Sequence, residues 1–256
     1  MKKKSILKVL AIALTATFYL TSCGQKSNDA HEHDEEEHSE EHSDNDGDSA
    51  SSEDESHEHD AHEHEHGGGA EMTMGEAKTW MPAGNAADAI AKDFHFITGS
   101  IDDLSAEVIT DEKEAGILKL SPSTGNPASF VFHSKFSNVG VSVALKRENF
   151  EGEFKIVHHA KDADTYEFVS VNGSQMKLGR MVAGEESIFD EASFESDEWL
   201  ILKVSAAGAH YKGYIGDQTT THGHGDEMEA GYVGIMIAGT GTVQIKQIEV
   251  TPIEAE

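Results

Sequence analysis

A strict alternation of apolar with small or polar residues at 139–145 most constrains what this chain can fold into. Val139, Val141, Val143 and Leu145 occupy every second position. Side chains of a β-strand point alternately to its two faces, so this period of two predicts a strand with one face in a core. Comparable apolar runs recur along the second half of the chain, at residues 130–136, 166–171, 176–178, 199–204, 209–215, 231–237 and 242–250.

Turn residues between these runs indicate an all-β domain. Asn172-Gly173 separates two of the runs, and this dipeptide is the strongest short signal for a β-hairpin. Helical periodicity is weak, and residues 86–92 are the best candidate for a short helix. Many short strands at close spacing predict a jelly-roll β-sandwich.

The composition before residue 70 is the opposite of that of the predicted sandwich. Residues 24–69 contain 18 Asp and Glu, one Lys, and no aromatic residue, Leu, Ile or Val. Such a segment lacks the apolar surface whose burial would offset the entropy of ordering it, so we expect a disordered linker. The formal net charge of −29 argues against nucleic acid as a partner, because the phosphate backbone would be repelled.

The amino terminus has the pattern of an export signal. Lys2, Lys3 and Lys4 precede an apolar stretch at 6–20, which is shorter than the roughly 20 residues needed to span a bilayer. It ends in Leu20-Thr21-Ser22-Cys23, which resembles a bacterial lipobox and contains the only Cys of the chain. The resemblance implies cleavage before Cys23 and its lipidation. A secreted protein with a free thiol is the alternative.

These signals predict four segments. They are a signal peptide at 1–22, a lipidated Cys23 with its linker at 23–69, a connecting segment at 70–92 and the sandwich at 93–256. The lipid would anchor the protein in a membrane of the bacterial cell envelope. An outer-membrane lipoprotein is expected, and the acids after Gly24-Gln25-Lys26 resemble a surface-export signal.

The strand motifs resemble those of concanavalin A-like lectin and glucanase sandwiches, and within them the 3-keto-disaccharide hydrolase-like family. The resemblance covers residues 93–252. It is carried by Asp164-Thr165-Tyr166-Glu167-Phe168 with Asn172-Gly173, by 199–204, by His210-Tyr211-Lys212-Gly213-Tyr214, and by 231–235 with 239–243. It implies a sandwich that binds or hydrolyses sugars.

Glu151 and Glu153 are the candidate catalytic carboxyls. Glycoside hydrolysis uses two carboxyls about 5 to 9 Å apart, and residues two apart on a strand share a face. The chain lacks the E-x-D-x-x-E motif of laminarinase-type glucanases, so a solvated acidic edge is the alternative. His158 and His159 follow closely, and adjacent residues of a strand are expected to point to opposite faces.

Two groups of residues are candidate metal ligands. Nine histidines of the linker stand among carboxylates, which suits zinc best and leaves copper, nickel or calcium open. They are His31, His33, His38, His42, His57, His59, His62, His64 and His66. The second group is His222, His224 and Asp226, in a segment with Gly223 and Gly225 that we expect to be a loop between two strands. A flexible surface loop without a ligand is the alternative.

Three functions are consistent with these features. The leading one is a membrane-anchored extracytoplasmic lipoprotein whose sandwich binds glycan or another extracellular ligand, with a metal-binding linker. The alternatives are a glycoside hydrolase of the 3-keto-disaccharide type and a metal-handling lipoprotein with the sandwich as scaffold. The sequence does not decide whether the protein is an enzyme, and it does not define an oligomeric state.

Overall fold

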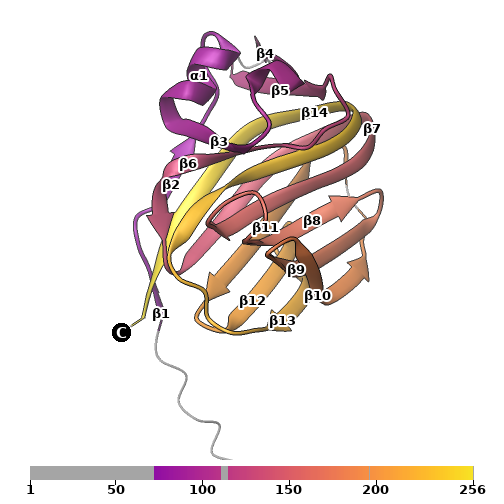
Figure 1. Ribbon diagram of the computed structural model, residues 1–256. Helices are drawn as coiled ribbons and strands as arrows, with labels where there is room; N and C mark the ends of the chain where they lie inside the picture. Colours follow the sequence, from indigo (N-terminus) through magenta and orange to yellow (C-terminus); the bar gives the residue numbers. More distant parts are fainter. Residues whose placement is uncertain (1–71, 111–114, 196, 256) are drawn as a thin grey trace, which may run out of the picture. The chain divides into compact units, whose positions relative to one another are not determined.

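The computed structural model describes residues 72–110, 115–195 and 197–255 (Figure 1). The signal peptide, Cys23 and the linker histidines lie outside these residues. Within the described part, no helix is both long and apolar enough to cross a bilayer. The helices found in the described ranges are α1 (Ala86–Asp93) and a 3₁₀ turn, η1 (Ile101–Asp103).

Seven strands form a continuous antiparallel path in the order β10-β9-β8-β7-β11-β12-β13. The hairpin predicted at Asn172-Gly173 is confirmed, because it joins β8 to β9 and Gly173 has a φ of 56°. The strands of this path are β7 (Val139–Ala160), β8 (Tyr166–Asn172), β9 (Gln175–Val182), β10 (Glu185–Ser193), β11 (Leu200–Ala207), β12 (His210–Ile215) and β13 (Gln218–His224).

The remaining strands are arranged around β14 (Gly231–Ala255), which pairs with β7 along nearly its whole length. β14 also pairs with β1, β2, β5 and β6, while β3 pairs with β6 and β4 pairs with β5. These strands are β1 (Met72–Met74), β2 (Lys78–Trp80), β3 (Phe94–Thr98), β4 (Leu104–Thr110), β5 (Gly116–Pro122) and β6 (Ala128–Phe136).

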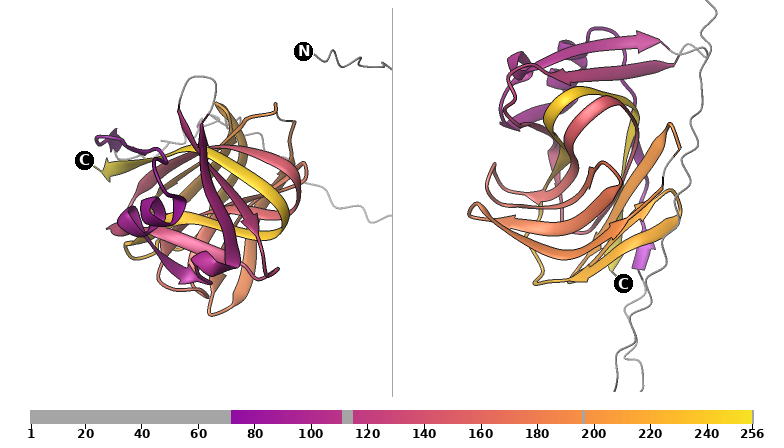
Figure 2. Two further views of the ribbon diagram at one scale, coloured as in Figure 1. Left: turned by 90° about the horizontal axis from the view of Figure 1, so that it is seen from above. Right: turned by 90° about the vertical axis from the view of Figure 1, so that its right-hand side faces the viewer.

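The long pair β7·β14 builds both layers of the sandwich. The first part of β7 pairs with β11 and the last part with β8, so the strand passes from one layer to the other. The two strands bend together (Figures 1 and 2), and their register shifts at three places. Such bulges increase bending and twist. At Gly239, with φ 141°, a Cβ would lie 2.3 Å from the Glu151 carbonyl oxygen, so the close approach needs glycine.

The expected all-β jelly roll is confirmed, and its core contains the alternating residues of 139–145. Val139, Val141, Val143 and Leu145 are all at most 2% exposed. Their neighbours in β7 face the other side of the sheet.

Residues 72–92 belong to the sandwich, although the sequence indicates a connecting segment. β1 and β2 both pair with β14, and Trp80 and Ile90 are buried in the core. Trp80 also donates from Nε1 to Asp93 Oδ2 at 3.1 Å. Trp199, which heads a predicted strand, is only partly buried.

The prediction of a loop around 221–227 is wrong for its first part. His222 and His224 lie on β13, which pairs with β12. β13 is rich in Thr and has no apolar period, so its sequence does not indicate a strand. The strand forms through backbone hydrogen bonds to β12, which do not depend on apolar side chains. β10 also lacks an apolar period, since most of its side chains are exposed.

Candidate functional site

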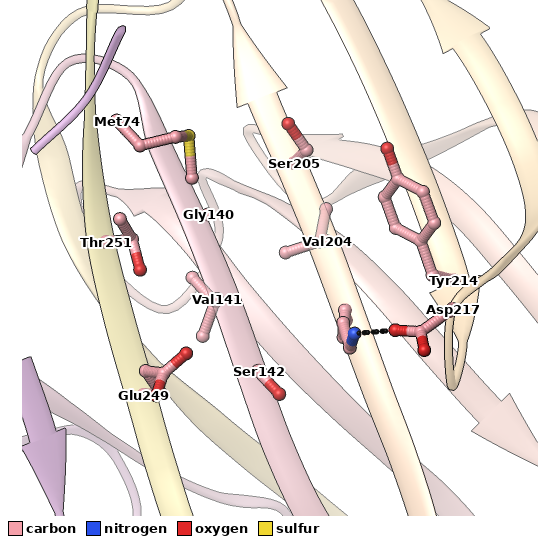
Figure 3. Close-up of a pocket in the computed structure, with 11 residues that line it drawn as sticks. Met74, Gly140, Val141, Ser142, Val204, Ser205, Tyr214, Asp217, Glu249 and Thr251 are labelled. Carbon is pink, nitrogen blue, oxygen red and sulfur yellow. Dashed lines mark hydrogen bonds and ion pairs between the residues drawn. The ribbon is translucent and has the colours of Figure 1, made fainter. Parts of the chain in front are cut away.

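The candidate ligand site is a groove of about 390 Å³ on the outer face of β14, β7, β11 and β12 (Figure 3). Glu249 pairs with Ser142, Ser142 with Lys203, and Lys203 with Tyr214. These four residues therefore form one row across four strands. The volume lies within the range of small-molecule pockets. The groove is also lined by Met74, Gly140, Val141, Val204, Ser205, Asp217 and Thr251.

Charged groups stand on two sides of this groove. Lys203 Nζ contacts Asp217 Oδ1 at 2.7 Å, and this hydrogen bond, with the charge of Lys203, lowers the pKa of Asp217. Thr79 Oγ1 donates to Glu249 Oε2 at 3.3 Å. Figure 3 shows the ion pair and the Tyr214 ring on one side and Glu249 on the other. Ser142 lies between them, and Gly140, between Ser205 and Thr251, adds no side chain. Polar groups and one aromatic ring therefore surround the groove.

Glu151 and Glu153 both lie on β7, separated by Gly152, whose φ is 148°. Glu151 is exposed. Glu153 Oε2 forms an ion pair with Lys155 Nζ at 3.1 Å, and Lys155 also lies 4.0 Å from the centre of the Phe168 ring. Glu153 therefore neutralises a buried cation.

The expectation that His158 and His159 face opposite sides is wrong. Both are buried, and their Nδ1 atoms lie 3.0 Å apart. His159 has a φ of 48°, and the β7·β14 register shifts beside it, between Tyr232 and Gly234. This bulge interrupts the alternation, so two adjacent side chains enter one interior site.

Glu167 is the centre of this buried cluster. It accepts from Arg180 Nε at 2.9 Å and also contacts Arg180 Nη2, while His159 Nδ1 lies 2.7 Å from its other oxygen. Burial would raise the pKa of Glu167, but the His159 hydrogen bond and the interactions with His158 and Arg180 hold it below its usual value. Burial lowers the pKa of His158 to about 3, so this ring is neutral at pH 7.

His210, His222 and His224 form a second cluster on the solvent side of β12 and β13. Their ring nitrogens lie within 4.8 Å of one another, and all three residues are exposed. Asp226 is not in this cluster. Its backbone carbonyl accepts from Tyr211 at 3.1 Å and from Arg180. The sequence did not identify His210 as a member of this cluster, because it lies on the preceding strand. The signal that would identify it is the register of the β12·β13 hairpin, which pairs His210 with His224.

Comparisons with known proteins support the fold. No protein-family pattern matches the chain, and no curated protein matches it in sequence. Among solved structures, a Bacillus subtilis protein of unknown function with a galectin-like fold has a TM-score of 0.54 and 9% identity, covering 73% of this chain and 100% of its own. A Shewanella oneidensis protein of unknown function has a TM-score of 0.52 and 12% identity, covering 70% and 87%. A native glycosidic hydrolase has a TM-score of 0.50 and 8% identity, covering 70% and 97%.

Proposed function

We propose that this protein is a lipid-anchored protein of the bacterial cell envelope whose sandwich binds a glycan in the groove of Figure 3. The row Glu249, Ser142, Lys203 and Tyr214 carries the proposal. A row of hydrogen-bonding side chains that ends in an aromatic ring offers both contacts that a sugar needs, to its hydroxyls and to its C–H face. The row is set by strand register, so it is formed before the ligand arrives.

The charge of the protein favours a neutral glycan. The net charge of the chain is −29, and in the groove Lys203 balances the charge of Asp217, so Glu249 leaves one net negative charge at the site. Sulfated or uronic-acid polymers would be repelled by this field. Hydroxyl groups of a neutral sugar can donate to the carboxylates and accept from Lys203.

Lipidation at Cys23 and a linker at 24–69 complete the proposal. A flexible chain of this length has an end-to-end span of roughly 35 to 40 Å, which would hold the sandwich away from a membrane. The linker histidines would bind divalent ions, zinc foremost. Replacing Cys23 with Ser should release the protein into the soluble fraction, and a variant that remained with membranes would contradict the anchor.

Calorimetry of the mature chain with neutral oligosaccharides tests the groove. The panel contains β-1,3- and β-1,4-linked glucans and a 3-keto-disaccharide. We expect Tyr214→Ala to weaken binding about fivefold, because an aromatic contact contributes about 1 kcal/mol. Tyr232→Ala, which removes a ring beside Lys135 on another part of the sandwich, is the matched control. Equal binding by wild type and Tyr214→Ala, or binding of no sugar, contradicts the proposal.

Hydrolysis is the second candidate, because Asp217 and Glu249 stand across one groove. A glycosidase needs a general acid with a raised pKa. The ion pair with Lys203 lowers the pKa of Asp217. Every carboxyl of the described residues whose pKa is clearly displaced has it lowered, namely Asp103, Glu148, Glu167 and Asp217. Binding is therefore favoured. Sugar cleavage by wild type that is lost in Glu249→Gln would make the protein an enzyme.

A further inference from the structure

We propose that His210, His222 and His224 form a transition-metal site on the sandwich itself, separate from the linker. His210 and His224 are directly opposite each other in the β12·β13 register, and His222 is two residues from His224 on the same strand. Cross-strand partners and residues two apart share one face of a sheet. The three imidazoles therefore converge on the solvent side of one hairpin, with ring centres 4.7 and 4.6 Å from His224.

The spacing of the ring nitrogens is close to that of a metal-bound set. All three lie within 4.8 Å of one another. With Zn–N distances of 2.0–2.1 Å, neighbouring ligands of a tetrahedral zinc are about 3.3 Å apart. Small rotations of the exposed rings would bring the nitrogens from the observed spacing to the spacing that zinc needs. Within the described residues, these rings contact one another and take part in no hydrogen bond or ion pair, so their nitrogens are available.

The backbone beneath the cluster is held on both strands. Asp190 of β10 accepts from the His222 backbone N–H at 2.8 Å, and the Gly225 N–H donates to the Ala209 carbonyl at 3.1 Å. Gly223, between the two histidines of β13, packs on Phe189, and a Cβ there would lie 2.5 Å from the Phe189 Cβ. Glycine lets β13 lie this close to the interior. A site on a fixed hairpin loses little entropy when it binds an ion.

The ligand set selects the class of metal. Three neutral imidazoles without a carboxylate suit zinc, copper or nickel and do not suit calcium or magnesium, which take oxygen ligands. Three protein ligands leave a fourth tetrahedral position for water or another molecule. Lys212 is the register partner of His222 and also of Ser205, which lines the groove. The metal site and the groove therefore share one face, and the glycan panel should be repeated with zinc.

Thermal unfolding of the mature chain with zinc separates this site from the linker. An ion that binds only the folded state raises the melting temperature. The sequence predicts a disordered linker. Ions on such a linker would bind equally well whether the sandwich is folded or unfolded, so they would not raise the melting temperature. At a free zinc concentration about 100 times the dissociation constant, we expect the melting temperature of wild type to rise by about 5–10 °C.

Three single variants, His210→Ala, His222→Ala and His224→Ala, should each lose most of this rise and keep the melting temperature of metal-free wild type. His133→Ala is the matched control, because His133 is an exposed histidine on another strand, β6. It should retain the full rise. A rise that survives in all three cluster variants, or no rise in wild type, overturns the proposal. Cobalt absorption gives an independent readout of ligation. The linker histidines are the same in every variant, so the part of the absorption that the three cluster variants lose and His133→Ala keeps comes from the cluster.

Discussion

Two clusters of three side chains that could bind a metal have similarly close ligand atoms but differ in their exposure to solvent. His158, His159 and Glu167 are buried, whereas the His210, His222 and His224 cluster is exposed. Each set gathers its ligand atoms within 4.8 Å. Residue types and distances alone therefore do not distinguish a ligand site from a structural network; the partners of each atom do.

In the buried cluster most polar atoms are already engaged. Glu167 contacts Arg180 with one oxygen and His159 with the other, and His159 Nε2 lies 2.6 Å from the Ser137 carbonyl. A divalent ion there would have to displace these contacts and sit close to a guanidinium. Within this cluster, which the structure describes completely, His158 Nε2 is the one polar atom without a partner. We interpret this cluster as a charge network that ties β7, β8 and β9 together.

The position of the exposed cluster depends on the buried cluster, through Arg180 and Tyr211. Arg180 and Tyr211 both hold the Asp226 carbonyl, two residues beyond His224. Tyr211 is the neighbour of His210 and points into the core, where it is 1% exposed. The buried cluster therefore fixes the ends of both strands that present the exposed histidines.

The largest expected effect is that of Glu167→Gln. Removing the anion leaves the largely buried guanidinium of Arg180 without its countercharge and disturbs the buried hydrogen bond between His159 and this side chain, and such a loss costs about 3–5 kcal/mol. Urea unfolding at pH 7 measures it. Glu107→Gln, which breaks the exposed pair with Lys119, is the control and should cost no more than about 1 kcal/mol. Equal stability of the two variants would show that the buried network does not hold the fold.

The second expected effect is that the free energy of unfolding depends on pH through the titration of His158. Burial lowers its pKa in the folded protein to about 3, from about 6.5 for an unperturbed histidine. Between these values the unfolded chain binds a proton that the folded chain refuses, so stability falls as pH drops from about 6.5 toward 3. The limiting slope from one group is about 1.4 kcal/mol per pH unit.

Unfolding free energies at pH 6.5 and 4.5 test this, with His158→Phe as the variant. The Phe ring is similar in size and does not titrate, so stability should fall less over this range than in wild type. Val157→Ala, which loosens the same buried region without removing a titrating group, is the control, and its pH dependence should match that of wild type. The same slope in wild type and His158→Phe contradicts the assignment.

Gly223→Ala should have an intermediate effect on stability, and it should also weaken zinc binding by the exposed cluster. Its new Cβ would lie 2.5 Å from the Phe189 Cβ, so β13 must move outward. Overpacking of this kind costs about 1–3 kcal/mol. We also expect a smaller zinc-dependent rise in melting temperature than in wild type. Gly216→Ala, in the β12–β13 turn where a Cβ meets nothing, is the steric control, although its φ of 60° adds some strain. An unchanged zinc response in Gly223→Ala would mean that the position of β13 is not critical.

The smallest expected effect on stability is that of replacing all three exposed histidines by Ala. Surface substitutions without buried partners change stability by about 0.5 kcal/mol or less. Urea unfolding without metal should therefore match wild type, while zinc binding by the sandwich is lost. A large loss of metal-free stability would place the exposed cluster in the same structural class as the buried one.

Local periodicity was sufficient for much of the fold. Val139, Val141, Val143 and Leu145 predicted a strand and its buried face, and Asn172-Gly173 predicted a hairpin, because both signals arise within a few residues. The short helix expected at 86–92 appears as α1, where Asn85 caps the Asp88 backbone N–H. Trp80 was missed as a core residue, since β2 is only three residues long and its pairing with β14 joins positions far apart in the chain.

By itself, the sequence determined the class of the fold, the positions of its apolar strands and the sharp change in composition after residue 69, because these depend on neighbouring residues. Tertiary structure decided which polar side chains meet. A bulge at His159 turned two adjacent histidines toward one carboxylate. Cross-strand register, not proximity in sequence, placed His210 beside His224 and aligned Tyr214 with Lys203. Register is set by the pairing of whole strands, so the residues of a site on a sheet cannot be identified from any one segment.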